Sequence, residues 1–312
     1  MVQKYSHTPI IILQAISMYK ISSLLLLALF VSNGFAQETP VKRYKDVIYT
    51  KHDGVALTMD VIKPKKSNGL GVISIVSGGW KSNHQGIGSG QPFIDRGYTV
   101  FYVVHGSQPR FIVEEIVADI HSAVKYIRSN AKTYGINPRK IGITGSSAGG
   151  HLSLMIATQL NRPNVPADEA AAKDPLSGVS SEVQAAAVFY PPTDYLSWGA
   201  EGDVAVGVGK LADYSAAFGR KSLTAEGREE LGRKLSPIYG VHAGQPPVFI
   251  IHGDADSSVP IFQAYCFQKK CREVGADLEL KVISGGGHGG SPNMKKDAEL
   301  MADFFDRKLA GK

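Results

Sequence analysis

Short apolar runs recur along the chain and alternate with segments of helical periodicity. Runs rich in β-branched and aromatic residues, such as GVISIV at 71–76 and YTVFYVV at 98–104, are typical of strands buried on both faces of a sheet. The same pattern predicts further strands at 140–144, 183–190, 247–252 and 278–283. Two shorter runs, at 46–49 and 56–62, flank the turn-forming residues His52-Asp53-Gly54 and predict a hairpin.

Helical periodicity is clearest at 114–132, where Ile116, Ile120 and Val124 fall on one side of a helix. Similar patterns predict helices at 148–160, 261–274 and 297–309. Because helices separate most of the strands, we expect right-handed β-α-β units, a mainly parallel sheet and an α/β fold.

The segment from 193 to about 236 breaks this alternation. It is rich in glycine, alanine and charged residues and contains only short helical patches. Since it lies between two predicted strands, we expect it to stand outside the sheet as a cap or lid. A surface insertion without function is the alternative.

The N-terminal segment has the pattern of a secretory signal peptide. Lys20 precedes the apolar run ISSLLLLALFV, and small residues stand at Gly34 and Ala36, before the expected cleavage point. The run is shorter than the ~20 residues that a membrane span requires, although an uncleaved anchor is the alternative. We therefore predict a signal peptide at 1–36, with Met18 as a possible start, a mature domain at 37–312, and a periplasmic or secreted location.

Composition adds few constraints. Hydrophobic residues make up 43% of the 312 residues, enough for one substantial core or two small ones. The formal net charge of +6 would fall by two with the loss of Lys4 and Lys20, and no basic cluster indicates nucleic-acid binding. Cys266 and Cys271 lie on different faces of one predicted helix, which favours free thiols. No Cys/His pattern has the spacing of a metal site, so no metal is expected.

The sequence Gly145-Ser146-Ser147-Ala148-Gly149 is the strongest candidate for chemistry. It has the form G-x-S-x-G and lies between a predicted strand and a predicted helix, which is the context of a nucleophile elbow. Ser147 is then the nucleophile. The alternative is a serine-rich turn that only caps a helix.

A serine nucleophile needs a base and an orienting acid, which follow it along the chain in this type of site. Asp254 and Asp256 both follow the strand 247–252, and we favour Asp256 because Asp254 is placed to cap the turn. His288, in a glycine-rich loop after the last strand, is the expected base. His84 and His105 are reserve candidates, whereas His151 is expected to pack and His252 to order the acid loop.

The oxyanion of an acyl-transfer intermediate requires backbone N–H donors. We assign them to Ala148, which follows the nucleophile, and to Gly79 and Trp80 in the loop after the strand 71–76. Trp80, Tyr190 and Trp198 are expected to line a substrate pocket, although ordinary packing aromatics are equally consistent with the pattern.

Together, the motifs GSSAGGH, SGGW, HGDADSSVP and GGGHG resemble those of the α/β-hydrolase superfamily. More narrowly, they resemble the bacterial esterase/lipase group related to hormone-sensitive lipase and to feruloyl-esterase-like (BD-FAE-like) domains. The resemblance covers most of residues 45–310. It implies an α/β-hydrolase fold, with a doubly wound sheet, helices on both faces and a small cap.

The same resemblance implies a serine carboxylic ester hydrolase that needs no metal or organic cofactor. Exported members of the group often act on acylated plant polysaccharides. Two features depart from the group: Ser77 stands where its oxyanion loop commonly has histidine, and His105–Arg110 replaces a Tyr-Arg-Leu-type stretch. Arg110 is expected to pair with a loop carboxylate rather than to meet an acidic or sugar substrate.

The favoured hypothesis is therefore an exported esterase that acts through an acyl-enzyme on Ser147. Its expected partners are short-chain or carbohydrate (acetyl or feruloyl) esters, free or linked to polysaccharide. Neither nucleic acid nor a membrane span after signal cleavage is expected, and nothing in the sequence indicates an oligomeric state. The alternatives are a prolyl-oligopeptidase-type serine peptidase and a catalytically inactive binding protein with a hydrolase fold.

Overall fold

The protein is described by a computed structural model that covers residues 41–158, 176–289 and 293–311. The predicted signal peptide at 1–36 and the last two residues of the predicted helix 148–160 lie outside these described residues.

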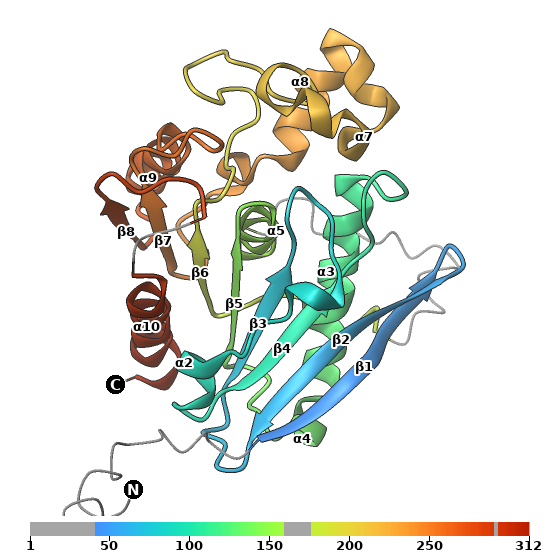
Figure 1. Ribbon diagram of the computed structural model, residues 1–312, viewed down its shortest axis with the longest axis vertical. Helices are drawn as coiled ribbons and strands as arrows, with labels where there is room; N and C mark the ends of the chain where they lie inside the picture. The colour runs from blue at the N-terminus through green and yellow to red at the C-terminus, as the bar shows by residue number, and fades with distance from the viewer. Residues whose placement is uncertain (1–40, 159–175, 290–292, 312) are drawn as a thin grey trace, which may run out of the picture. The chain divides into compact units, whose positions relative to one another are not determined.

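An eight-stranded mixed sheet forms the centre of the fold, with the strand order β1-β2-β4-β3-β5-β6-β7-β8 (Figure 1). β1 pairs antiparallel with β2, and β2 with β4, whereas the other neighbours are parallel. The strands are β1 (Val41–His52), β2 (Val55–Pro64), β3 (Gly71–Val76), β4 (Thr99–Val104), β5 (Ile141–Ser146), β6 (Ala185–Phe189), β7 (Val248–Gly253) and β8 (Leu278–Ile283).

All the predicted strands are present, but the first hairpin is longer than the pattern at 46–49 and 56–62 indicated. β1 is an edge strand, and most of its residues are exposed or only half-buried. An edge strand with so little burial carries little hydrophobic patterning, so its first residues could not be recognised from the sequence.

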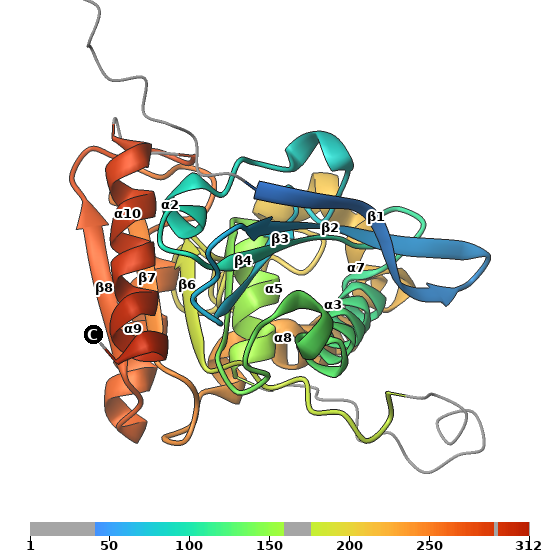
Figure 2. The same ribbon diagram turned by 90° about the horizontal axis from the view of Figure 1, so that it is seen from below.

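Helices cover both faces of the sheet (Figure 2). One apolar core lies between the sheet and the helices α3 (Val113–Ser129), α4 (Ala131–Tyr134), α5 (Ala148–Ala157) and α9 (Phe262–Val274). A second core lies on the other face, against α2 (Gln91–Ile94) and α10 (Met294–Phe305). α10 continues as a short π-helix, η5 (Asp306–Ala310), and a 3-10 turn, η1 (His84–Gly86), follows β3.

The segment predicted as a cap lies between β6 and β7 and contributes no strand to the sheet within its described residues. It contains short helices: η2 (Gly209–Tyr214), α7 (Ser215–Phe218), η3 (Arg220–Leu223), α8 (Ala225–Leu235) and η4 (Pro237–Gly240). Figure 1 shows α7 and α8 beyond the end of the sheet nearest the start of α5. Phe218 and Leu231 of this segment are buried in the same core as α5, so the cap is packed onto the body of the domain.

No helix in the described ranges is both long and apolar enough to cross a membrane. Cys266 and Cys271 are free thiols within α9, as the sequence predicted.

Candidate active site

Ser147 occupies a strained turn between β5 and α5. Its backbone φ of 52° is unusual for a residue with a side chain, and its N–H donates to the Phe189 carbonyl at 3.0 Å. Glycine at two positions makes the turn possible: a Cβ on Gly145 would lie 2.5 Å from the Gly149 backbone, and one on Gly149 would lie 2.8 Å from the Ile75 carbonyl oxygen. The predicted nucleophile is therefore presented at the N-terminus of α5 by the surrounding backbone.

His288 connects Ser147 to an acid. Its Nε2 lies 3.0 Å from Ser147 Oγ, and its Nδ1 lies 2.8 Å from Asp256 Oδ2. With the proton on Nδ1 donated to the carboxylate, Nε2 is free to accept the serine proton. The three side chains predicted from distant parts of the sequence are thus brought together.

Asp256 is held as an anion by its surroundings. It is buried, which alone would raise the pKa of its carboxyl, but hydrogen bonds from His252, His288 and the Val259 N–H outweigh burial and hold that pKa well below its usual range. Asp254 instead is exposed and accepts the Gly285 N–H at 2.6 Å. The structure therefore brings Asp256, and not Asp254, to the imidazole.

His252 orders the acid loop, as expected. Its Nε2 bonds the Val259 carbonyl at 2.8 Å and lies 3.5 Å from Asp256 Oδ2. The reserve histidines have other partners. His84 is exposed and bonds Thr58, whereas His105 is buried, bonds the carbonyl oxygen of its neighbour Gly106, and has a pKa lowered to about 4 by burial.

The predicted oxyanion donors lie beside the nucleophile. Gly79 (φ 54°) and Trp80 (φ 57°) line one cavity together with Ser147 and Ala148. Among the described residues, neither the Gly79 nor the Trp80 amide donates to a protein acceptor. Both amides remain available to a ligand.

Gln108 braces this loop, a role that sequence reasoning missed. Its N–H donates to the Trp80 carbonyl at 3.1 Å, and its side-chain Nε2 donates to the Gly79 carbonyl at 3.3 Å. Ser77, which replaces the usual histidine, does not take that role, because its hydroxyl has no hydrogen-bond partner in the described structure. The unusual stretch at 105–110 was the available signal.

Arg110 of the same stretch corrects a prediction. Its guanidinium donates to the backbone carbonyl of Asp53 rather than to a loop carboxylate, and it lies over the Phe111 ring. It thereby fixes the tip of the β1–β2 hairpin against this loop.

His151 links three elements of the site. It is fully buried, and burial lowers its pKa to about 4, so the ring is neutral near pH 7. Its Nδ1 accepts the Trp80 indole N–H at 3.3 Å, and its Nε2 donates to the Leu235 carbonyl at 2.7 Å. The oxyanion loop, the nucleophile helix and the cap thus meet at one imidazole.

A cavity of about 320 Å³ lies over Ser147. Two of the three aromatic residues predicted for it, Trp80 and Trp198, line it. Tyr190 is not among the lining residues; its ring packs 4.6 Å from the His288 ring instead. Its backbone φ of 34° is strained for a residue with a side chain, and its ring contacts His288 outside the lining of this cavity.

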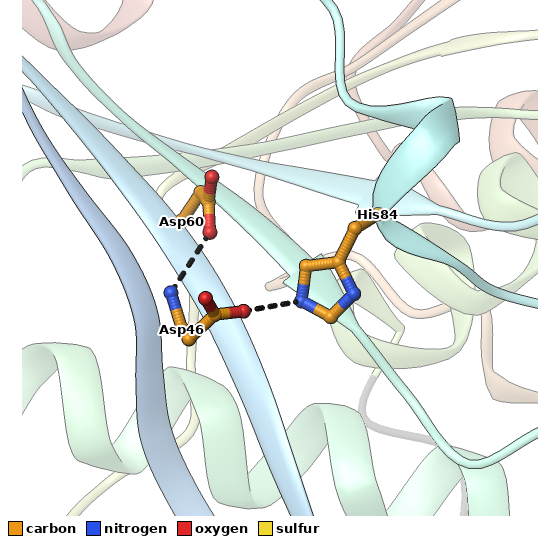
Figure 3. Close-up of side chains that lie close together, drawn as sticks. All are labelled: Asp46, Asp60 and His84. Carbon is orange, nitrogen blue, oxygen red and sulfur yellow. Dashed lines mark hydrogen bonds and ion pairs between the residues drawn. The ribbon is translucent and has the colours of Figure 1, made fainter.

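Asp46, Asp60 and His84 form a cluster whose side chains lie close together (Figure 3). Both carboxylate oxygens of Asp60 are engaged, one by the Asp46 N–H at 3.0 Å and the other by the Arg43 guanidinium at 2.7 Å. The positive charge of Arg43 already pairs with Asp60, which leaves little reason for a metal ion to bind there. The contacts instead hold β1 against β2 where the pairing between the two strands shifts its register.

The comparison with protein families matches residues 59–271 to the family described as BD-FAE. The chain belongs to the BD-FAE family. The match ends before His288, so the histidine predicted as the base lies outside the matched region.

Curated relatives of this BD-FAE chain are esterases. It is 29% identical over 183 residues to "Esterase LipQ" of Mycobacterium tuberculosis, covering 59% of this chain and 40% of that protein. It is 28% identical over 208 residues to "Probable carboxylic ester hydrolase LipM" of the same organism, covering 65% of this chain and 45% of that protein. The chain thus spans less than half the length of these two relatives.

A solved structure described as a truncated carbohydrate esterase from gut microbiota superimposes with a TM-score of 0.73 at 25% identity. That match covers 88% of this chain and 99% of the other. A butyrate-bound esterase from Thermogutta terrifontis superimposes with a TM-score of 0.66 at 26% identity, covering 88% of this chain and 97% of the other. The predicted family and the predicted α/β-hydrolase fold are both confirmed.

Proposed function

We propose that this BD-FAE chain is a serine carboxylic ester hydrolase that works through an acyl-enzyme on Ser147. The observation that carries the proposal is the continuous hydrogen-bonded path from Ser147 Oγ through His288 to Asp256. The esterase names of its relatives support the same chemistry.

In the first half-reaction, His288 Nε2 accepts the Ser147 proton as Oγ attacks the ester carbonyl carbon. The amides of Gly79, Trp80 and Ala148 hold the negative charge that develops on the carbonyl oxygen, each contributing roughly 10²–10³ in rate. Collapse of this intermediate breaks the bond to the alcohol, which leaves with the proton from His288. Asp256 stays ionised and stabilises the imidazolium.

In the second half-reaction, water replaces the alcohol. His288 Nε2 accepts a proton from the water as its oxygen attacks the acyl carbon bound to Ser147. The second intermediate collapses to release the carboxylic acid, and His288 returns the proton to Ser147 Oγ. Every proton transfer in both halves passes through one imidazole nitrogen.

The proposed substrates are short-chain or carbohydrate-linked acetyl and feruloyl esters. The cavity over Ser147 supports this class, since about 320 Å³ lined by Trp80 and Trp198 suits a small acyl or aromatic group. The signal-like pattern before residue 37 supports export to the periplasm or the medium.

Labelling with a fluorophosphonate followed by peptide mapping tests the chemistry, and an ester series tests the substrate class. We expect the label on Ser147 and turnover of 4-nitrophenyl acetate and acetylated xylan. Absence of labelling with no ester turnover would refute the esterase proposal. Turnover of peptide substrates without ester turnover would replace it with a peptidase.

A further inference from the structure

Lys210 is the one lysine or arginine among the described residues that line the cavity over Ser147, and it is exposed to solvent. It belongs to η2 of the cap and lines the cavity together with Ser147 and His288. The remaining lining residues are uncharged: Gly79, Trp80, Ala148, Pro192, Trp198, Leu211, Tyr214, Ser257, Ser258 and Val259.

Lys210 differs from the five other basic residues of the cap because it alone among them lines the cavity. Two of the five, Arg220 and Arg228, are like Lys210 in having no ion-pair partner among the described residues, and the other three are paired. Lys221, Arg233 and Lys234 each pair with a glutamate: Glu230, Glu229 and Glu114 respectively. Lys210 has no ion-pair partner among residues 41–158, 176–289 and 293–311. Its ammonium group is therefore available to a ligand.

The rest of the wall suits an anion bound beside an apolar group. The apolar residues Trp80, Trp198 and Leu211 belong to the lining, although each is buried and exposes little surface. Ser257 and Ser258, which also line the cavity, are residues with a hydroxyl that can donate to an anion. The described lining itself contains no carboxylate, and the nearest anion of the site, Asp256, lies behind His288 and is hydrogen-bonded to it. A ligand that covered Lys210 without pairing its charge would impose a desolvation cost on the ammonium, whereas a carboxylate would offset that cost.

We propose that Lys210 forms a subsite for a carboxylate carried by the ester substrate. This proposal rests on the esterase function and specifies its substrate class: an ester with a second, acidic group. The carboxylate belongs either to the alcohol part, as in an O-acylated uronate, or to the acyl part, as in a hemiester of a dicarboxylic acid. Both sources present the same group to the ammonium.

Two substrate pairs separate these sources and isolate the charge. For the alcohol part, 4-acetoxybenzoate is compared with 4-acetoxybenzamide. For the acyl part, the 4-nitrophenyl hemiester of adipic acid is compared with its amide-capped form. The measured quantity is the ratio of kcat/KM for the acid to kcat/KM for the amide. In the unaltered protein we expect this ratio to favour the acid in one pair by about three- to fivefold, the range of a partly exposed ion pair.

Lys210→Met should bring the favoured ratio to about one or below, and Lys210→Glu should lower it further by repulsion. Lys210→Arg should retain the preference, which separates loss of charge from disturbance of the cap. Lys221→Met is the matched control, because it removes a cap lysine that is paired with Glu230 and does not line the cavity. High salt should weaken the preference in the unaltered protein.

A ratio near one in both pairs, or a preference that survives Lys210→Met, would overturn the subsite. An equal effect of Lys221→Met on the ratio would also overturn the subsite. It would show that the summed positive charge of the cap favours the acid, without a direct contact between Lys210 and the carboxylate. Failure of the esterase function is distinguishable, because in that case the amide-containing esters are not hydrolysed and Ser147 is not labelled.

Discussion

The Nε2 atom of His288 lies 3.0 Å from the Oγ atom of Ser147, although 141 positions separate the two residues along the chain. Ser147 follows β5 and His288 follows β8, and parallel strands bring the loops after their carboxyl ends to the same edge of a sheet. The fold thus supplies the proximity, and the strained turn at Ser147 supplies the direction of the hydroxyl.

Replacement of Ser147 by alanine should abolish ester hydrolysis. The change removes the attacking oxygen but no buried side-chain contact, so kcat should fall by at least about 10⁴-fold while the free energy of unfolding changes by less than about 0.5 kcal/mol. Hydrolysis of 4-nitrophenyl acetate and urea unfolding measure the two quantities. Activity close to that of the unaltered enzyme would show that another residue is the nucleophile.

Asp256→Asn should impair the enzyme far more than Asp254→Asn. Asp256 accepts a hydrogen bond from His288 Nδ1–H, and an amide in its place favours the wrong tautomer, for which a loss in kcat of about 10³–10⁴-fold is expected. Asp254 accepts a hydrogen bond from the Gly285 amide. Its replacement by asparagine should therefore lower mainly the free energy of unfolding and leave kcat largely unchanged. Steady-state rates at saturating substrate compare the two, and a larger loss in kcat for Asp254→Asn would exchange their roles.

Gly79→Ala tests the oxyanion loop, with Gly78→Ala as its neighbouring control. A Cβ at Gly79 would lie 2.5 Å from the Tyr214 ring, and φ is 54°, whereas a Cβ at Gly78 meets nothing within 4 Å. Since misplacement of a catalytic group by about 1 Å can cost 10²-fold, we expect a loss of that order in kcat for Gly79→Ala. An unchanged kcat in that variant would contradict the assignment of the Gly79 amide as an oxyanion donor.

Gln108→Ala should lower kcat with little change in KM. The variant removes the side-chain hydrogen bond to the Gly79 carbonyl but keeps the backbone bond to Trp80, so a loss of about three- to tenfold is reasonable for one neutral hydrogen bond. Gln91→Ala, at an exposed side-chain contact with Asp95, is the control. An increase in KM at constant kcat would indicate a role in substrate binding instead.

The sequence was sufficient to predict most of the strands and the three side chains that the structure brings together, because both leave local signals. Runs such as 71–76 are apolar on both faces, and Ser147, Asp256 and His288 each follow a predicted strand. The contacts that hold the loops of the site in place leave no such signal in the sequence. Gln108 acts through a carbonyl oxygen that any residue at position 79 would supply, so its role depends only on how two loops meet.

Tyr190 failed as a predicted pocket residue for a similar reason. Its position directly after β6 is visible in the sequence, but the side to which its ring turns depends on the backbone φ of 34° and on where His288 lies. For His151, the sequence predicted the burial of the side chain but not its hydrogen-bond partners. A histidine inside an apolar helix indicated burial, whereas its bonds to Trp80 and Leu235 join segments whose contact no local pattern specifies.

The burial of His151 predicts a specific pH dependence of stability. Its pKa is lowered from the ordinary 6.5 to about 4 by burial, so between these values the unfolded chain binds more protons than the folded one. The free energy of unfolding should therefore fall as the pH drops from 6.5 toward 4. At pH 5 the contribution lost is on the order of 2 kcal/mol relative to pH 7.

His151→Gln removes this titration and should give a shallower decline, even though the variant is less stable at pH 7 because the bonds to Trp80 and Leu235 are disturbed. Urea unfolding at pH 7, 6 and 5 measures the slope. His242→Gln, at an exposed histidine, should leave the slope of the unaltered protein in place. His105, whose pKa is also about 4, contributes equally to every variant compared and cancels from the differences. Parallel slopes for His151→Gln and the unaltered protein would mean that the buried imidazole becomes protonated without unfolding, and that its bond to the Trp80 indole is broken by acid within the folded state.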